Sequence, residues 1–514
     1  MSDWTAGYVA DISYTYGYYR ELNPLATQLA FLNHGLFPPE VRTACELGYG
    51  QGLSANLHAA GSVTEWYGTD FNPSQAAFAK SLGDASGARI HLFDEAFSDF
   101  THRTDLPDFD YIGLHGIWSW VSDENRALIV DFIRRKLKVG GVLYLSYNTL
   151  PGWASAVPLR HLLTEHAEVM AAPGRGIVHR IDAALEFAEK LFALNPRYAT
   201  ANPQVVERLK AMKDQNRHYM AHEYFNRDWH PMHFATLAEW LEPAKLTYGC
   251  SAYYLDHVSE LNFSAEQKAF LNDIPDPRFR ESVRDFIVNQ PFRRDYWVKG
   301  PRRIDSLEQS EALRHLQVML AIPRAEVSLK VKSSQAEANL SESINNPILD
   351  VLADQQPHSL GQIEAKAKGV TFAQLIQAAT ILVGLDHVLA AQDEQAVAKA
   401  RPQTDRLNAY LVSKARGNSD VNFLASPVTG GGVGVSRFEQ LFLMALGQGH
   451  KTPREWAAFV AQILVMQGQK ILKEGKSLAT PEAIQAELEV QAKAFSEKRL
   501  PVLKAMLIWS DHSH

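Results

Sequence analysis

The sequence predicts an α/β fold, in which strands of a parallel sheet alternate with helices, and two observations support this prediction. The first is a glycine-rich turn, Gly48-Tyr49-Gly50-Gln51-Gly52, between a short strand-like run and the opening of a helix. The second is the alternation of short apolar runs with helical patterns up to about residue 150. Such alternation is typical of βαβ units with a parallel sheet.

The glycine-rich turn follows the first predicted strand, which ends near Glu46. Three glycines at alternate positions allow a tight turn and let backbone N–H groups approach a ligand without a side chain in the way. A nucleotide-like cofactor is therefore expected here. The dinucleotide-binding pattern G-x-G-x-x-G would need glycine or alanine at position 53, where this chain has Leu53.

The second and third predicted strands also end in acidic residues. Residues 64–69 lead into Asp70, whose carboxylate can accept hydrogen bonds from both hydroxyls of a ribose. Residues 89–93 lead into Asp94 and Glu95. A pyrophosphate is not expected beside so many carboxylates, whereas a cationic sulfonium would tolerate them.

These acid-tipped strand ends resemble motifs I, II and III of the class I S-adenosylmethionine-dependent methyltransferases, whose sheet is Rossmann-like. The resemblance implies S-adenosyl-L-methionine as the cofactor, with the first acid near the methionine end, the second on the ribose and the third beside the adenine. The alternative is an unrelated α/β domain with a glycine turn. The implied cofactor-binding residues are Tyr16, Tyr19, Glu46, Gly48, Tyr49, Gly50, Gly52, Asp70, Phe71, Asp94, Glu95, His115 and Gly116.

The fourth and fifth predicted strands, 109–114 and 142–148, enclose a helical pattern over about 123–137. Ligands of open α/β sheets bind beyond the carboxyl ends of the strands, so the residues that follow both strands are expected near the site. The stretches at 115–121 and 146–153 are similar to paired signatures of bacterial methyltransferases that carry a methyltransferase regulatory domain.

Further stretches that resemble this group lie at 222–225, 231–234 and 289–294. The group includes protein-lysine methyltransferases that modify outer-membrane proteins. The tyrosine-rich N-terminus matches the lysine-methylating members poorly, which leaves the substrate open.

Methyl transfer is an in-line displacement, so the protein must align the nucleophile and free its lone pair. For a lysine this requires loss of a proton and desolvation of the amine, to which an aromatic slot with nearby acceptors is suited. We expect Trp118, Trp120, Tyr147 and Trp153 to form the slot. The candidate catalytic residues are His115, Trp118, Tyr147, Asn148 and Trp153.

Histidines near the expected site have two interpretations each. His115 is either a general base or a neutral histidine hydrogen-bonded to a strand end or the cofactor. His222 and Glu223 either close a cap over the cofactor or tie the helical insertion to the sheet.

Residues 8–19 contain five tyrosines. We expect at least one of Tyr14, Tyr16, Tyr18 and Tyr19 to touch the cofactor or the substrate; the alternative is that they are half-buried packing residues.

A chain of 514 residues predicts two or three domains. Sheet strands are expected to resume at 245–250 and 293–298, with helices over 264–290. The glycine run 429–434 lacks the Lys-Ser/Thr of a phosphate loop and is expected to be a flexible turn. The predicted organisation is an N-terminal cap at 1–40, a methyltransferase domain at 41–150 and 220–305, a helical insertion or lid at 151–219, a winged-helix-like middle domain at 306–410 and a C-terminal helical domain at 411–514.

Composition restricts the partners. A net charge of −7 argues against a general nucleic-acid binder, and no apolar run approaches membrane-spanning length. Two cysteines, and an N-terminus without a signal pattern, predict a reduced, cytoplasmic protein. We find no spacing typical of metal ligands in the C-terminal half and expect no metal.

The leading hypothesis is a methyltransferase that N-methylates lysine side chains of a protein substrate. The alternatives are a methyltransferase for a small molecule or a cell-surface sugar, and a non-catalytic cofactor-binding regulator whose winged-helix-like module binds nucleic acid. The oligomeric state is left open.

Overall fold

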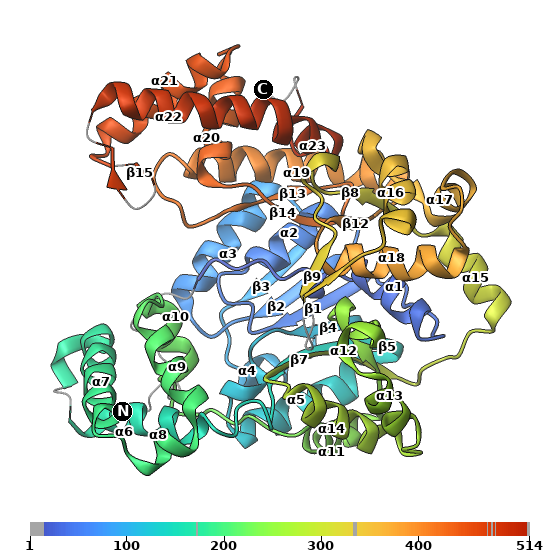
Figure 1. The fold of residues 1–514 in the computed structure, drawn as a ribbon, viewed down its shortest axis with the longest axis vertical. Coiled ribbons are helices and arrows are strands. Elements are labelled where there is room, and N and C mark those ends of the chain that lie inside the picture. The colour runs from blue at the N-terminus through green and yellow to red at the C-terminus, as the bar shows by residue number, and fades with distance from the viewer. Residues whose placement is uncertain are drawn as a thin grey trace.

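The computed structural model describes residues 15–170, 173–332, 337–469, 471–473, 476–478 and 480–510. Its centre is a seven-stranded sheet of order β3-β2-β1-β4-β5-β7-β6, in which β7 is antiparallel to both neighbours (Figure 1). The strands are β1 (Thr43–Leu47), β2 (Glu65–Thr69), β3 (Ile90–Phe93), β4 (Phe109–Leu114), β5 (Leu137–Asn148), β6 (Leu246–Ser251) and β7 (Phe292–Lys299). The predicted Rossmann-like α/β fold is confirmed.

The fifth strand is longer than the sequence predicts. The strand was expected to begin at residue 142, but the chain already pairs with β4 at Leu137, and the register shifts before Val142. Gly140 has a φ of +82°, a backbone conformation that glycine adopts without strain. Gly140 and Gly141 therefore lie within the strand and do not end it.

The two faces of the sheet bury alternate residues, as the period of two requires. On one face Trp66, Tyr111 and Tyr144 pack with α1 (Ala26–Asn33) and α2 (Leu53–Gly61). On the other face, Cys45, Ile112 and Leu145 pack with α5 (Asp123–Lys136) and α11 (Phe234–Leu241). The helices α3 (Pro73–Ser86) and α4 (Phe97–Phe100) complete the layers.

Local sequence explains where the sheet helices begin. The Asn72 side chain accepts hydrogen bonds from the first turn of α3, and Pro73 occupies the first helical position. The Ser122 side chain caps α5 in the same way. In α5 the acidic residues lie in the first turn and the basic residues in the last, which complements the helix dipole.

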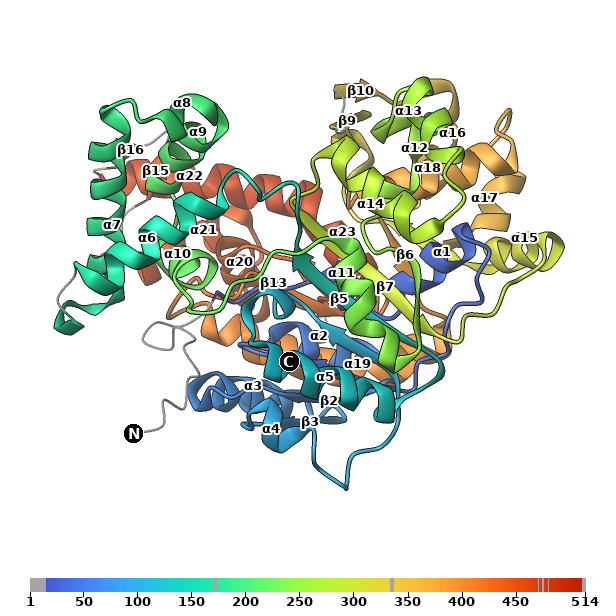
Figure 2. The ribbon, with the colours of Figure 1, turned by 90° about the horizontal axis from the view of Figure 1, so that it is seen from below.

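The predicted insertion is helical and forms a lobe at one end of the molecule, drawn in green in Figures 1 and 2. Its helices bury a cluster of their own that includes Leu163, Ile181 and Leu209. They are α6 (Val157–Val169), α7 (Gly176–Ala193), α8 (Arg197–Ala201), α9 (Pro203–Lys213) and α10 (Arg217–Tyr224).

The middle region contains a three-stranded antiparallel sheet of order β11-β8-β12 together with several helices. The segment between β6 and β7 contributes α12 (Ser259–Asn262), α13 (Ala265–Asn272) and α14 (Pro277–Val288). The middle region then comprises α15 (Ser306–His315), β8 (Gln317–Leu320), β9 (Lys330–Lys332), β10 (Glu337–Asn339), α16 (Glu342–Val351), β11 (His358–Ser359), α17 (Leu360–Lys366), α18 (Phe372–Gly384) and β12 (Val388–Ala391).

The C-terminal region covers α2 and α3, and its large hydrophobic cluster includes Leu53 and Leu57 from α2. In Figure 1 its helices, drawn in orange and red, lie above α2 and α3. They are α19 (Glu394–Lys414), α20 (Arg437–Gly447), α21 (Pro453–Met466), α22 (Pro481–Ala494) and α23 (Leu500–Ala505), with the strands β13 (Phe423–Ser426), β14 (Gly431–Gly434), β15 (Leu472–Lys473) and β16 (Lys476–Ser477).

The glycine run at 429–434 was predicted to be a flexible turn, but only its first two residues lie in a turn, and the rest is a strand. Residues 431–434 form β14, which pairs with β13, and the hairpin lies against α2. A Cβ atom on Gly432 would come within 2.9 Å of Leu57 Cδ1, and one on Gly61 within 2.8 Å of the backbone of Gly430. The glycines permit a close approach between the hairpin and the helix.

Candidate active site

A cavity of about 340 Å³ lies at the carboxyl ends of β1, β2 and β4. Its floor is the glycine-rich turn, and α10 of the insertion contributes to the opposite wall. The residues that line it are Thr15, Gly17, Tyr19, Glu46, Gly48, Tyr49, Gly50, Gln51, Gly52, Leu53, Ser54, Asp70, Phe71, Gln75, Glu95, Ala96, Phe97, Ser98, His115, Gly116, Ile117, Trp120, Val121, Ser122, Asn125, His222, Glu223 and Asp228.

The turn requires glycine at three positions. Gly48, Gly50 and Gly52 have φ angles of +74°, +57° and +66°, in the left-handed region that other residues rarely adopt. The Gly48 N–H donates to the Thr69 carbonyl oxygen at 2.8 Å, which holds the turn against β2. A Cβ atom on Gly52 would also lie 2.5 Å from Cβ of Ala79. The turn therefore keeps its shape only with this glycine spacing.

Asp70, at the end of β2, is oriented by two backbone donors. Its carboxylate accepts from the Gly50 N–H at 2.9 Å and from the Asn72 N–H at 3.0 Å. Burial raises the pKa of Asp70 to about 6, although these hydrogen bonds lower it. The carboxylate therefore faces the cavity mainly as an anion at neutral pH.

Glu46, at the end of β1, has a buried side chain with an unmatched oxygen. It is 3% exposed, and its Oε2 atom has no hydrogen-bond partner in the described part of the chain. Burial, and then the nearby Asp70, raise the pKa of Glu46 to about 8. A buried polar atom without a partner is costly. A donor or cationic group in the cavity would therefore stabilise this carboxyl group.

The third acid pair separates into two environments. Glu95 lines the cavity and pairs with Arg103 at 2.6 Å. Asp94 lies outside the cavity lining and pairs with Lys80 at 3.1 Å on the surface. The structure therefore brings Glu95, but not Asp94, to the predicted cofactor region, because successive residues point to opposite sides of an extended chain.

His115, at the end of β4, stacks on Tyr19 with ring centroids 3.6 Å apart. Its Nδ1 atom is hydrogen-bonded to the Tyr144 hydroxyl at 2.8 Å. Burial lowers the pKa of His115 to about 4, so the ring is neutral at neutral pH. Of the two sequence interpretations, this geometry favours a neutral histidine that shapes the cavity wall.

The tyrosines of the N-terminal segment have different surroundings. Tyr19 lines the cavity, whereas Tyr16 packs edge-on against Phe78 with centroids 5.0 Å apart and does not reach it. Tyr18 packs between His58 and the hairpin of the C-terminal region. Tyr14 lies outside the described residues.

The predicted aromatic slot does not form at the cavity. The Trp118 indole N–H donates to Met232 Sδ at 3.2 Å, and the Tyr147 hydroxyl donates to Asp295 at 3.2 Å. Both side chains are fully buried. Trp118, in the 3₁₀ turn at 118–120, and Tyr147, in β5, belong to the hydrophobic cluster between the sheet and α11. Of the four predicted slot residues, only Trp120 lines the cavity.

Asn148 and Trp153 also lie away from the cavity lining. Asn148 is buried at the end of β5, where its backbone N–H donates to Ser119 Oγ at 2.9 Å. Trp153 packs in the insertion, with its ring centroid 5.0 Å from that of Trp229 and 4.0 Å from the guanidinium carbon of Arg208. Trp153 therefore joins the insertion to the sheet domain instead of contacting the cavity.

The sequence analysis assigned no catalytic role to an acidic wall formed by α10 and the segment that follows it. Glu223 of α10 and Asp228, beyond the end of that helix, line the cavity together with His222. Burial raises the pKa of Glu223 to about 7. The one available signal was the His-Glu-Tyr-Phe stretch at 222–225, whose position relative to the glycine turn depends on the whole insertion.

The cavity is acidic overall. The described residues that line it include no lysine or arginine, and they contribute five carboxyl groups, from Glu46, Asp70, Glu95, Glu223 and Asp228. Such a wall favours cationic ligands and disfavours phosphates.

No helix within the described residues is both long and apolar enough to cross a membrane.

Comparison with known proteins shows which sequences this chain resembles. A sequence model described as "Predicted methyltransferase regulatory domain" matches residues 216–299. The uncharacterized protein sll1526 of Synechocystis sp. is 40% identical over 507 residues, which cover 97% of this chain and 98% of the relative. The uncharacterized protein RP028 of Rickettsia prowazekii is 33% identical over 138 residues, which cover 26% of this chain and 54% of that protein.

Among solved structures, PKMT2 from Rickettsia typhi in complex with AdoHcy superposes with a TM-score of 0.70 at 18% identity, covering 96% of this chain and 100% of that one. A second structure of PKMT2 gives a TM-score of 0.66 at 17% identity, with coverage of 95% and 98%. The chain therefore belongs to the family of the Synechocystis protein, and it combines the class I methyltransferase fold with a methyltransferase regulatory domain.

Proposed function

We propose that this protein is an S-adenosylmethionine-dependent methyltransferase that N-methylates lysine side chains of a protein substrate. The observation that carries the proposal is the single cavity that joins the glycine turn and the strand-end acids to the acidic wall of α10. One end of this cavity suits the cofactor and the other suits a cationic acceptor.

The residues present fit the cofactor. Asp70 offers carboxylate oxygens to ribose hydroxyls, and the unmatched Oε2 of Glu46 offers an acceptor to an ammonium group. Phe71 and Phe97 supply apolar surface near Glu95 for an adenine. The bound cofactor would supply an electrophilic methyl group on a sulfonium. PKMT2, which shares the fold, is described in complex with AdoHcy, the demethylated form of this cofactor.

The acceptor end suits a lysine side chain. Glu223 and Asp228 attract an ammonium group, and Trp120 and Ile117 offer apolar surface to its aliphatic stem. A lysine must lose a proton before it can react, and the pKa of Glu223, raised by burial to about 7, suits a proton acceptor near neutral pH. His115 stays neutral and helps to fix the wall.

A protein substrate is supported by the modules outside the sheet domain, by analogy with the solved relative named as a PKMT. A neutral sugar hydroxyl would gain little from the acidic wall, which is why we rank a sugar acceptor lower. The cytoplasmic location stays a prediction from the sequence.

The test is methyl transfer from isotopically labelled S-adenosylmethionine to a bacterial protein extract, with and without prior chemical blocking of lysine amines. We expect label in methylated lysines of the unblocked extract only. Label that persists after blocking, or that enters only small molecules, would contradict the lysine assignment. Calorimetric titration with S-adenosylmethionine, with NAD as the control ligand, tests the cofactor separately.

A further inference from the structure

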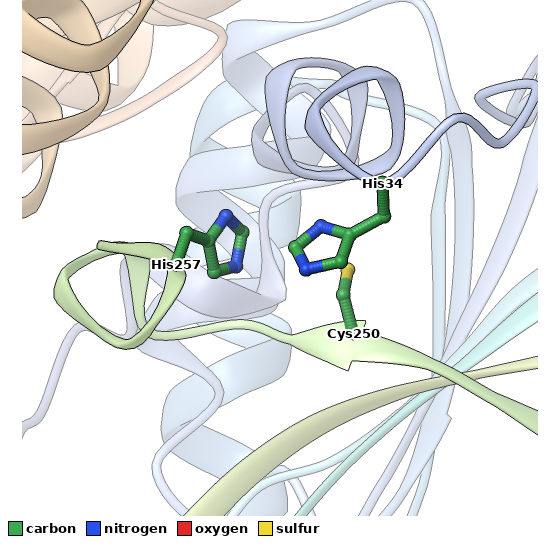
Figure 3. Close-up of side chains that lie close together, drawn as sticks. All are labelled: His34, Cys250 and His257. Atoms are coloured by element: carbon green, nitrogen blue, oxygen red, sulfur yellow. The ribbon is translucent and has the colours of Figure 1, made fainter. Parts of the chain in front are cut away.

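A cluster of metal-binding side chains lies outside the cavity (Figure 3). His34 follows the last residue of α1, Cys250 lies in β6, and His257 ends a 3₁₀ helix, η5 (Tyr254–His257). One ligand atom from each residue lies within 4.8 Å of the other two. Cys250 and His257 are close in the sequence, but His34 is distant from both, so no local spacing reveals all three ligands.

Each histidine is already oriented by a backbone acceptor. His34 Nδ1 lies 2.9 Å from the Ala30 carbonyl oxygen, and His257 Nε2 lies 2.7 Å from that of Ser251. A carbonyl oxygen only accepts, so these nitrogens carry the hydrogen of a neutral ring. The remaining nitrogens, Nε2 of His34 and Nδ1 of His257, then present lone pairs. Histidines that bind metals are usually held in this manner.

Burial adds a second observation. His257 Nδ1 is buried and has no hydrogen-bond partner among the described residues. Cys250 is 1% exposed, and its Sγ donates a weak hydrogen bond to the Ala30 carbonyl oxygen at 3.7 Å. The two imidazole rings meet nearly at right angles, with centroids 4.5 Å apart, and Figure 3 shows the His34 ring between the His257 ring and the cysteine sulfur.

We propose that His34, Cys250 and His257 form a binding site for a zinc ion, with an exogenous ligand in the fourth position. Two imidazoles and a thiolate are a donor set that zinc prefers, and three protein ligands leave one coordination position open. Tetrahedral coordination at usual zinc bond lengths places ligand atoms about 3.3–3.7 Å apart. The side chains must therefore close by about 1 Å, which the exposed His34 at a helix end can do by rotating.

Binding would also change the chemistry of the buried thiol. A thiol that coordinates zinc loses its proton, so binding would convert the buried Cys250 to a thiolate and release a proton. The ion would then connect α1 to β6 and η5. Asn33, beside His34, donates to Thr380 of α18 at 3.0 Å, so this connection lies next to the contact with the middle region.

The experiment uses the full chain, stripped with a chelator and titrated with Co²⁺ as a spectroscopic probe. We expect one equivalent to bind, with the visible bands of tetrahedral cobalt and a near-ultraviolet thiolate-to-cobalt band, and Zn²⁺ to displace it. Cys250→Ala should abolish the thiolate band. The matched control is Cys45→Ala, which removes the other buried cysteine and should leave the spectrum unchanged.

A second variant covers the case in which Cys250→Ala does not fold. His34→Ala alters an exposed side chain and should weaken Co²⁺ binding by at least about tenfold while leaving the circular dichroism spectrum unchanged. Octahedral spectra, a thiolate band that survives Cys250→Ala, or equal affinity in His34→Ala would each overturn the proposal. None of the three side chains lines the cavity, so this result and that of the methyl-transfer assay are independent.

Discussion

Replacing Glu223 by glutamine tests the proton acceptor of the cavity through two independent readouts. Burial raises the pKa of Glu223 from its ordinary value near 4.5 to about 7. Between these values the folded protein keeps a proton on this carboxyl group, whereas the unfolded chain has lost it. The free energy of unfolding therefore falls as the pH rises through this window, and it levels off above pH 7.

The difference between the two pKa values corresponds to about 3 kcal/mol. Glutamine resembles the protonated carboxyl group in shape and carries no charge at any pH. The free energy of unfolding of Glu223→Gln, relative to the wild type, should therefore increase by about 3 kcal/mol between pH 4.5 and pH 8. Urea denaturation of both proteins across this range measures the change, and the comparison cancels the titration of groups that both share.

The same variant should lose methyl transfer. Removal of a general base typically costs about 10²-fold or more in rate, so kcat at pH 8 should fall by that factor while calorimetry finds the affinity for S-adenosylmethionine unchanged. In the wild type, kcat should rise with pH through about 7 as Glu223 ionises.

The control is Glu239→Gln, which alters an exposed carboxylate on α11 and should change neither stability nor rate with pH. A stability gap for Glu223→Gln that stays constant with pH would refute the burial argument. A gap that opens as expected, with an unchanged kcat, would leave Glu223 a buried carboxylate without a role in the reaction.

Three further substitutions test the remaining contacts. Asp70→Ala should lower cofactor affinity by at least about tenfold in calorimetry with an unchanged circular dichroism spectrum, because it removes the ribose acceptor; unchanged affinity would place the cofactor elsewhere. Trp153→Ala should destabilise the insertion by about 3–5 kcal/mol and lower transfer more than cofactor affinity, and a lost rate with an unchanged melting temperature would instead place Trp153 at the reacting groups. Gly432→Val should cost about 1–3 kcal/mol through its clash with α2, whereas Gly417→Val, at an open position, should cost little; equal melting temperatures would contradict the close packing of the hairpin.

The sheet and the cofactor end of the cavity were predictable because both follow from short stretches of sequence. A strand, a glycine turn and a helix are encoded within about twenty residues, and the carboxyl ends of parallel strands meet at one edge. That Glu46, Asp70 and Glu95 line the same cavity can therefore be predicted without reference to distant parts of the sequence.

The acceptor end could not be derived in this way. Trp118, Tyr147 and Trp153 lie near the carboxyl ends of β4 and β5, yet each packs against a residue that is distant in the sequence. These partners are Met232, Asp295 and Trp229. Whether an aromatic side chain faces a cavity or a core depends on what covers it, and here the covering elements are α11 and the insertion.

In the N-terminal segment, the position of each residue in the sequence predicts its surroundings better than the number of tyrosines does. Residues 15–19 have no regular secondary structure, yet alternate residues have different surroundings. Thr15, Gly17 and Tyr19 line the cavity, whereas Tyr16 and Tyr18 pack against the hydrophobic cluster of the C-terminal region. A period of two, rather than the number of phenols, thus separates the side chain beside His115 from its neighbours. One short segment therefore contacts both the hydrophobic cluster of the C-terminal region, through Tyr16 and Tyr18, and the cavity, where Tyr19 stacks on His115.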